Sequence, residues 1–148
     1  MNSNMEVLRH FAKVSETLNL IPKEQIDSFV TSLDSIRMAG KTLFVAGNGG
    51  SYAIAEHIAT DFAKGLLTST GSPIRCLSIG SNGPLLSAIS NDMGYESSIS
   101  IPLQIYAQKG DAVLLISSSG ASRNIISGVE IARKLGLVVL ALSGFGEL

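Results

Sequence analysis

Short apolar segments that run directly into turns of glycine or serine constrain the fold of this chain more than any other feature. Residues 42–46 are followed by residues 47–51 (Gly-Asn-Gly-Gly-Ser), and residues 112–116 are followed by residues 117–120 (Ser-Ser-Ser-Gly). A helix-forming stretch comes after each turn. Continuous apolar runs of this length are typical of parallel strands that are covered on both faces. The alternation of strands and helices therefore predicts an α/β fold, a three-layer αβα sandwich with a mainly parallel sheet.

Hydrophobic spacing and turn residues place the other elements. Two amphipathic helices are expected before the first strand, over residues 5–20 and from Pro22 to Gly40. They either cover this domain or pack against a partner subunit, and spacing alone does not decide between the two. The elements expected after them are strands at 42–46, 74–79, 112–116 and 137–142, helices at 51–64, 84–90, 101–108 and 123–135, a loop at 68–73 and an interruption at 91–96.

Composition limits the classes of function. The 148 residues fit one domain, and 45% of them are hydrophobic, enough for a core. A net charge of -1 gives no basic field for nucleic acid, and no apolar run is long enough to span a membrane. Cys76, the single cysteine, lies in an apolar segment and is expected to be a buried, inert thiol. Together with an N-terminus that lacks a signal-peptide pattern, this predicts a cytoplasmic protein.

The glycine turn at residues 47–51 is a predicted anion-binding site. Glycine allows positive φ angles and a close approach of the backbone to a ligand. The first N–H groups of the following helix have no intrahelical partner and carry the positive end of the helix dipole. Gly49, Gly50 and the hydroxyl-bearing Ser51 are therefore expected to bind a phosphate group. A dinucleotide site is not expected, because Tyr52 stands where the third glycine of that fingerprint would be.

A serine cluster after the third predicted strand forms a second predicted anion site. Ser117, Ser118, Ser119 and Ser122 crowd the start of a helix, and Ser122 is suited to be its N-cap. Hydroxyls and free N–H groups at such a position suit a phosphate monoester. Because the carboxyl ends of parallel strands share one edge of the sheet, the two turns are expected to grip one phosphate from two sides.

His57 and Asp61 lie four residues apart on the helix that follows the glycine turn. This spacing puts both side chains on the same helix face. They are either an acid/base or metal-binding unit or an ordinary local pair on the surface, and the spacing alone favours the local pair.

These residues resemble those of a known family. The turn at 47–51, then Ala55 and His57, the stretch Asn-Asp-x-Gly-Tyr-Glu at 91–96 and the serine loop are similar to the phosphoheptose isomerases. These are sugar isomerase (SIS) domains of flavodoxin-like fold that interconvert sedoheptulose 7-phosphate and D-glycero-D-manno-heptose 7-phosphate. The resemblance covers nearly the whole chain. It implies one SIS domain over residues 1–148, with residues 1–40 used for oligomerisation.

The resemblance also implies an assembly and roles for single residues. It implies a homotetramer with active sites between subunits and a sugar-phosphate substrate. His57 matches a histidine that binds zinc in metal-containing members, and Asp61 falls where the family has a glutamate that is both metal ligand and catalytic base. The implied phosphate contacts come from Ser51, Ser117, Ser119 and Ser122, and the implied sugar contacts come from Asn48 and Asp92.

Two departures from the family leave two hypotheses. Asp61 is one methylene shorter than glutamate, and a carboxylate displaced by about 1 Å can lose on the order of a hundredfold in rate. The family's chains also continue beyond this length, and the resemblance places there a glutamine and a histidine that complete the metal site. The chain is therefore expected to be an aldose–ketose isomerase, with a non-catalytic SIS module, either a sugar-phosphate-binding regulator or a tetrameric adaptor, as the alternative.

Overall fold

The structure is a computed structural model that describes residues 3–145. The contacts divide the chain into two compact units, one up to Asp34 and the other from Ser35 onward. The first unit holds α1 (Ser3–Asn19) and most of α2 (Lys23–Met38). The second unit holds β1 (Thr42–Gly47), α3 (Gly50–Thr60), η1 (Asp61–Gly65), α4 (Leu66–Thr70), β2 (Arg75–Ser78), α5 (Gly83–Met93), η2 (Tyr95–Ser97), α6 (Ser100–Tyr106), β3 (Ala112–Ser117), α7 (Arg123–Leu135) and β4 (Val138–Ser143).

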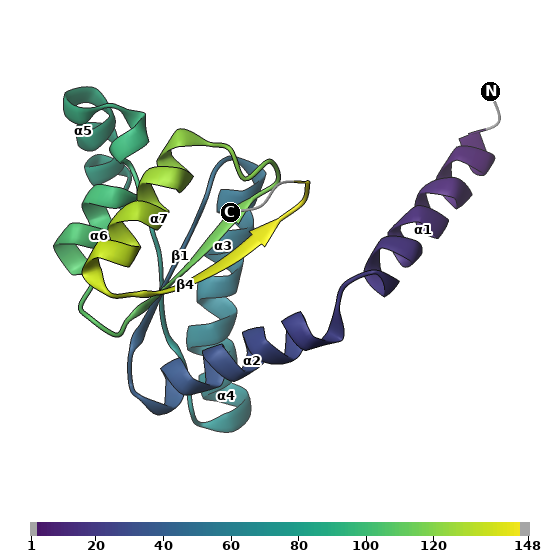
Figure 1. Ribbon diagram of the computed structural model, residues 1–148, viewed down its shortest axis with the longest axis horizontal. Helices are drawn as coiled ribbons and strands as arrows, with labels where there is room; N and C mark the ends of the chain where they lie inside the picture. Colours follow the sequence, from purple (N-terminus) through teal and green to yellow (C-terminus); the bar gives the residue numbers. More distant parts are fainter. Residues whose placement is uncertain (1–2, 146–148) are drawn as a thin grey trace. The chain divides into compact units, whose positions relative to one another are not determined.

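The sheet of the second unit has four strands in the order β2-β1-β3-β4, and each neighbouring pair is parallel. Parallel strands need crossover connections, which are right-handed in nearly all proteins. The crossover from β1 to β2 therefore places α3 on one face, whereas the crossovers to β3 and β4 place α5, α6 and α7 on the other (Figure 1). The prediction of an α/β fold with a parallel sheet is confirmed.

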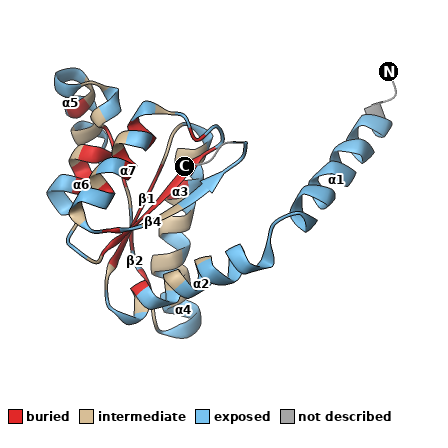
Figure 2. Cartoon of the chain, viewed as in Figure 1, coloured by how far each residue is buried: buried red, intermediate tan, exposed pale blue. Residues whose placement is uncertain are grey.

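The core follows the two central strands. Residues 42–46 of β1 and all residues of β3 are buried (Figure 2). Buried side chains of α6 and α7 belong to the same hydrophobic cluster as residues of these two strands. The edge strand β4 is less covered, since no residue within its bounds is buried. Among residues 3–145, no helix is both long enough and apolar enough to cross a membrane.

The predicted loop at residues 68–73 is wrong in its first half. Residues up to Thr70 are helical, and the hydroxyls of Thr68, Ser69 and Thr70 donate hydrogen bonds to carbonyls one turn back, in η1 and at the start of α4. Side chains of this kind compete with the backbone for hydrogen bonds, yet here they satisfy helical carbonyls. The chain leaves the helix only at Gly71, where φ is 71°.

The predicted interruption at residues 91–96 also begins too early. Asn91 and Asp92 lie in the last turn of α5, and the chain turns at Gly94 with φ of 86°. The side-chain amide of Asn91 donates to the carboxylate of Asp92 at 2.7 Å, so these polar groups bond to each other and not to the backbone. The helix starts as expected, with Pro84 in its first turn and Asn82 capping the N–H of Leu85.

Candidate functional site

The glycine turn and the serine loop lie side by side at the carboxyl ends of two paired strands. β1 and β3 are neighbours in the sheet, and Gly47 pairs with Ile116 near their ends. The chain leaves β1 towards α3 on one face and leaves β3 towards α7 on the other (Figure 1). Such a point, where neighbouring strands lead to opposite faces, opens the crevice in which parallel α/β proteins bind ligands. The expected convergence of the two turns is thus present in the fold.

Each glycine of the first turn has a distinct structural reason. A Cβ on Gly47 would lie 2.6 Å from backbone atoms of Ser51, because the start of α3 folds back onto the end of β1. Gly49 has φ of 52° and ψ of -118°, a conformation that other residues adopt at a cost. Within residues 3–145, the N–H groups of Gly49 and Gly50 donate no hydrogen bond. These two N–H groups and the hydroxyl of the half-buried Ser51 are donors for an anion.

The serine loop is held by its own hydrogen bonds. The hydroxyl oxygen of Ser117, a buried residue, accepts from the N–H of Gly120 at 3.1 Å, and that of Ser119 accepts from the N–H of Ala121 at 3.3 Å. The carbonyl of Ser118 accepts from the N–H groups of Gly144 and Phe145. Because an accepting hydroxyl keeps its own hydrogen, Ser117 and Ser119 are still able to donate to a ligand.

Ser122 stands at the predicted N-cap position of α7, but its hydroxyl makes no capping hydrogen bond. In the first turn of the helix, the side-chain oxygen of Asn124 accepts a hydrogen bond from the N–H of Ile125 at 3.1 Å. The hydroxyl of Ser122 is therefore not used by the helix that it precedes.

A network of amides and hydroxyls joins this site to the opposite face. The side-chain amides of Asn48 and Asn124 donate to each other's oxygen, at 2.9 Å and 2.8 Å. The hydroxyl of Tyr95 donates to the oxygen of Asn48 at 2.9 Å, and the amide of Asn124 also donates to the hydroxyl of Ser98 at 3.1 Å. The sequence analysis selected Asn48 but missed the other three, which come from η2, the residue just after it and α7.

A small hollow of about 80 Å³ lies beside this network. Its lining includes the glycine turn, Tyr52, Gly80 and Tyr95. A Cβ on Gly80 would lie 2.8 Å from the ring of Tyr52, so that ring packs directly on the turn after β2. Burial raises the pKa of the Tyr52 phenol, and the neighbouring Glu56 raises it further, so that Tyr52 stays neutral as a hydrogen-bond donor.

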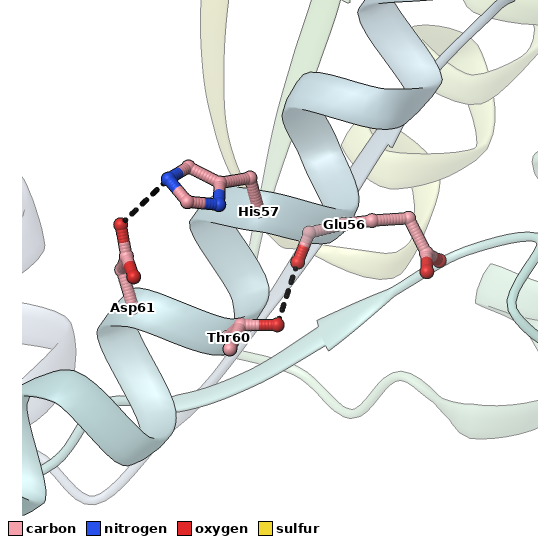
Figure 3. Close-up of polar contacts among 4 residues, drawn as sticks. All are labelled: Glu56, His57, Thr60 and Asp61. Carbon is pink, nitrogen blue, oxygen red and sulfur yellow. Dashed lines mark hydrogen bonds and ion pairs between the residues drawn. The ribbon is translucent and has the colours of Figure 1, made fainter.

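His57 and Asp61 form an exposed pair on the opposite side of α3 from Glu56 (Figure 3). The imidazole Nε2 and the carboxylate Oδ2 are 3.2 Å apart, and the two side chains are 78% and 60% exposed in the single chain. Asp61 also begins η1, a turn of π-helix, a form that occurs often at functional sites. Glu56 points the other way, with one carboxylate oxygen buried and unpaired.

The described residues do not assemble a metal centre. No group of three or more His, Cys, Asp or Glu side chains that would hold a metal ion is present in residues 3–145. Zinc in catalytic sites takes three protein ligands and in structural sites four. His57 and Asp61 therefore do not fit a zinc ion by themselves, and the chemistry below uses no step at a metal.

Asp92, the other predicted sugar contact, is exposed at the end of α5 and accepts a hydrogen bond from Asn91. It is not among the residues that line the hollow beside Asn48. Tyr95, three residues later, reaches Asn48 instead. The roles of Asp92, His57, Asp61 and the serines in binding or catalysis stay predictions.

A parallel sheet with two donor-rich turns at its switch point defines a class of α/β proteins that bind anionic ligands at strand ends. Residues 7–144 match the SIS domain family. The chain is 33% identical over 141 residues to a phosphoheptose isomerase of Campylobacter concisus, which covers 95% of this chain and 73% of that protein. It is 39% identical over 107 residues to a phosphoheptose isomerase of Crocosphaera subtropica, covering 72% of this chain and 54% of that protein.

The similarity of the fold to a solved structure indicates the same family. The structure of the phosphoheptose isomerase from Neisseria gonorrhoeae matches 97% of this chain and 78% of that one, with a TM-score of 0.85 and 27% sequence identity. The chain therefore belongs to the SIS domain family, in its phosphoheptose isomerase branch. It spans between 54% and 73% of the length of the two relatives named above. The predicted family and its isomerase class are confirmed at the level of these relatives.

Proposed function

We propose that this chain binds a sugar phosphate at the glycine turn and the serine loop and interconverts the ketose and aldose forms, with sedoheptulose 7-phosphate as substrate. The observation that carries the proposal is the juxtaposition of Gly47 and Ile116 at the ends of β1 and β3. It brings the two donor-rich turns together in a chain whose relatives are named phosphoheptose isomerases. The N–H groups of Gly49 and Gly50 and the nearby serine hydroxyls would hold the phosphate.

The length of α3 suits a substrate that is anchored at one end and reacts at the other. A helix rises about 1.5 Å per residue, so the backbone of His57 lies roughly 9 Å along the axis from Ser51. In a heptose 7-phosphate the phosphate and the carbonyl carbons stand at opposite ends of the sugar. A phosphate at the start of α3 therefore leaves the sugar free to extend towards the His57–Asp61 pair.

The proposed reaction is a proton transfer between neighbouring carbons. The Asp61 carboxylate takes the proton from C1 of the ketose, the C1–H electron pair forms the C1–C2 double bond, and the C2 carbonyl oxygen takes a proton from water to give an enediol. The protonated Asp61 then returns its proton to C2 while the hydroxyl on C1 loses its own proton to the hydroxide left from that water, which gives the aldose and restores the carboxylate. His57, whose Nε2 lies 3.2 Å from Asp61, would keep the carboxylate in place and exchange protons with it.

A non-catalytic SIS module is the second candidate, and two observations favour it. The His57–Asp61 pair is largely exposed in the single chain, whereas catalytic carboxylates act in sites that exclude water. No third metal-binding side chain joins the pair within the part of the chain that the structure describes. A regulator or adaptor of this kind would bind the sugar phosphate without turning it over.

Incubation of the protein with sedoheptulose 7-phosphate, followed by detection of the aldose product, tests the proposal. Asp61→Ala is expected to abolish turnover but to keep substrate binding, because Asp61 is remote from the phosphate turns. Asp61→Glu restores the carboxylate reach of the family and is expected to raise the rate. Substrate binding without turnover in both the parent and Asp61→Glu would support the second candidate, and the absence of binding would contradict both.

The assembly and setting belong to the same proposal. Apolar side chains of α1, among them Leu8, Phe11 and Leu18, are each more than 60% exposed in the single chain. We expect these helices to pack against other copies of the chain in a homotetramer, which light scattering of the purified protein would measure. Zinc would need ligands in addition to His57 and Asp61. A small sugar-phosphate substrate and one buried cysteine suit a cytoplasmic enzyme.

A further inference from the structure

We propose that Asn124 is a positioning residue that locks the side chain of Asn48, so that Asn48 offers an N–H donor and not a carbonyl oxygen to the bound sugar phosphate. The inference deepens the proposed function, on which its ligand rests. It comes from the hydrogen-bond network beside the glycine turn, in which the direction of each bond is fixed by its neighbours.

The orientation begins at a backbone group. The N–H of Ile125 is able only to donate, and it donates to Oδ1 of Asn124 at 3.1 Å. Oδ1 of Asn124 is therefore the oxygen, and the other side-chain atom is the NH₂ group. That NH₂ group uses both of its hydrogens, one on the hydroxyl of Ser98 at 3.1 Å and one on Asn48 at 2.8 Å.

The second amide follows from the first. The atom of Asn48 that accepts from Asn124 must be its oxygen, and its NH₂ group then donates to Oδ1 of Asn124 at 2.9 Å. Tyr95 donates its hydroxyl hydrogen to the same Asn48 oxygen at 2.9 Å. The oxygen of Asn48 thus accepts two hydrogen bonds, which fills both of its lone pairs. One N–H hydrogen of Asn48 remains for a ligand.

Burial makes this arrangement rigid. Asn124 and Ser98 are each only 3% exposed, so an amide turned the wrong way would leave buried polar groups unpaired. The helix that carries Asn124 also packs closely on the segment after η2, since a Cβ on Gly128 would lie 2.8 Å from the side chain of Ile99. Asn48 itself is half-buried and lines the hollow beside the glycine turn.

The chemical consequence concerns which ligand group meets Asn48. A fixed donor recognises an acceptor, such as a carbonyl, hydroxyl or phosphate oxygen of the sugar phosphate, and gives nothing to a group that only donates. The sequence did not reveal this, because Asn48 and Asn124 are 76 residues apart. The tyrosine of the stretch at residues 91–96 acquires a role as well, since its hydroxyl occupies the acceptor that Asn48 would otherwise present.

The first experiment reads the orientation without any ligand. In the NMR spectrum of the free protein, the two side-chain N–H protons of Asn48 are expected to differ, one exchanging slowly because it is bonded to Asn124 and one exchanging rapidly. Asn124→Ala is expected to remove this difference. Tyr95→Phe deletes one hydroxyl from a residue that is 51% exposed, so the fold should persist, and it should shift the Asn48 resonances. Asn19→Ala, an exposed asparagine of α1, is the matched control and should leave them unchanged.

The second experiment reads binding of sedoheptulose 7-phosphate by calorimetry in a double-mutant cycle. Loss of one hydrogen bond weakens binding by roughly 3- to 10-fold. If Asn124 acts through Asn48, the affinity of the double variant Asn48→Ala/Asn124→Ala should equal that of Asn48→Ala alone. Multiplied effects would show a purely structural role and overturn the proposal.

The two experiments separate the two levels of the argument. If neither the parent protein nor any variant binds sedoheptulose 7-phosphate, the proposed function fails. The NMR result still decides the orientation of Asn48 in that case. Equal exchange of both Asn48 N–H protons in the parent, or spectra that Tyr95→Phe leaves unaltered, would overturn the positioning role even if the protein is an active isomerase.

Discussion

Two alanine substitutions in the same turn should have opposite effects on folding. A Cβ on Gly47 would lie 2.6 Å from the backbone carbon and oxygen of Ser51 and 2.8 Å from its Cβ. Backbone atoms at the start of a helix have no simple way to move aside, so the first turn of α3 must shift away from β1. Overpacking of this kind costs about 1–3 kcal/mol of unfolding free energy.

Gly50 is the matched control because a Cβ there meets no atom within 4 Å and the residue is already helical. Gly50→Ala should raise the unfolding free energy by about 0.4–1 kcal/mol, since alanine has fewer conformations to lose on folding. The two variants, only three positions apart, should therefore differ by roughly 1.5–4 kcal/mol. Urea unfolding followed by circular dichroism measures both values.

The same two variants also test where the phosphate group binds. The space around Gly50 is where a phosphate would approach its N–H group, so Gly50→Ala should weaken binding of sedoheptulose 7-phosphate without a loss of stability. Equal urea midpoints for the two variants would refute the close contact between β1 and α3. Unchanged affinity in Gly50→Ala would refute the placement of the phosphate at this turn.

Three further predictions concern other parts of the chain. Burial raises the pKa of the Cys76 thiol to about 12, so at pH 8 a thiol reagent should react slowly with the native protein and rapidly in urea. The buried Asp111 accepts from the N–H groups of Thr42 and Gln108, so Asp111→Ala should cost about 1–3 kcal/mol for each unpaired N–H, and Asp111→Asn, which keeps one acceptor, should cost less in the same urea assay. Because the His57–Asp61 pair is exposed in the single chain, turnover per chain should fall when dilution dissociates the oligomer; a constant value across that range would contradict it.

Helices and strands whose start and end are each marked by characteristic residues could be predicted from the sequence. The helix expected at residues 123–135 is found with these bounds, since Ser122 precedes it in an extended conformation and Gly136 ends it with φ of 73°. The strand β3 was visible as a continuous apolar run because it is buried along its whole length. The segment at residues 68–70 was not predictable from composition, because its serine and threonine hydroxyls bond back to their own helix.

Only the parts of the site that lie at the ends of strands could be predicted from the sequence. Parallel pairing of β1 with β3 brings the glycine turn next to the serine loop, and the sequence indicated both turns. The hydrogen-bond partners of Asn48 could not be predicted from the sequence, for a different reason. Asn124 is one polar residue in the first turn of a helix, and only the packing of α7 against η2 shows that it is buried and paired.

The two halves of the candidate site differ in how much of their environment a single chain supplies. Around Asn48 the side-chain oxygen is paired with Asn124 and Tyr95, and the buried Asn124 and Ser98 fix the direction of these hydrogen bonds, which is the preorganisation that binding requires. Asp61, in contrast, pairs with His57 and is otherwise largely exposed to solvent in the single chain. Binding and turnover should therefore respond to different perturbations: changes in the network should alter affinity in every state of assembly, whereas changes in what covers α3 should alter the rate alone. The exposed apolar side chains of α1 give the chain the means to form such an assembly.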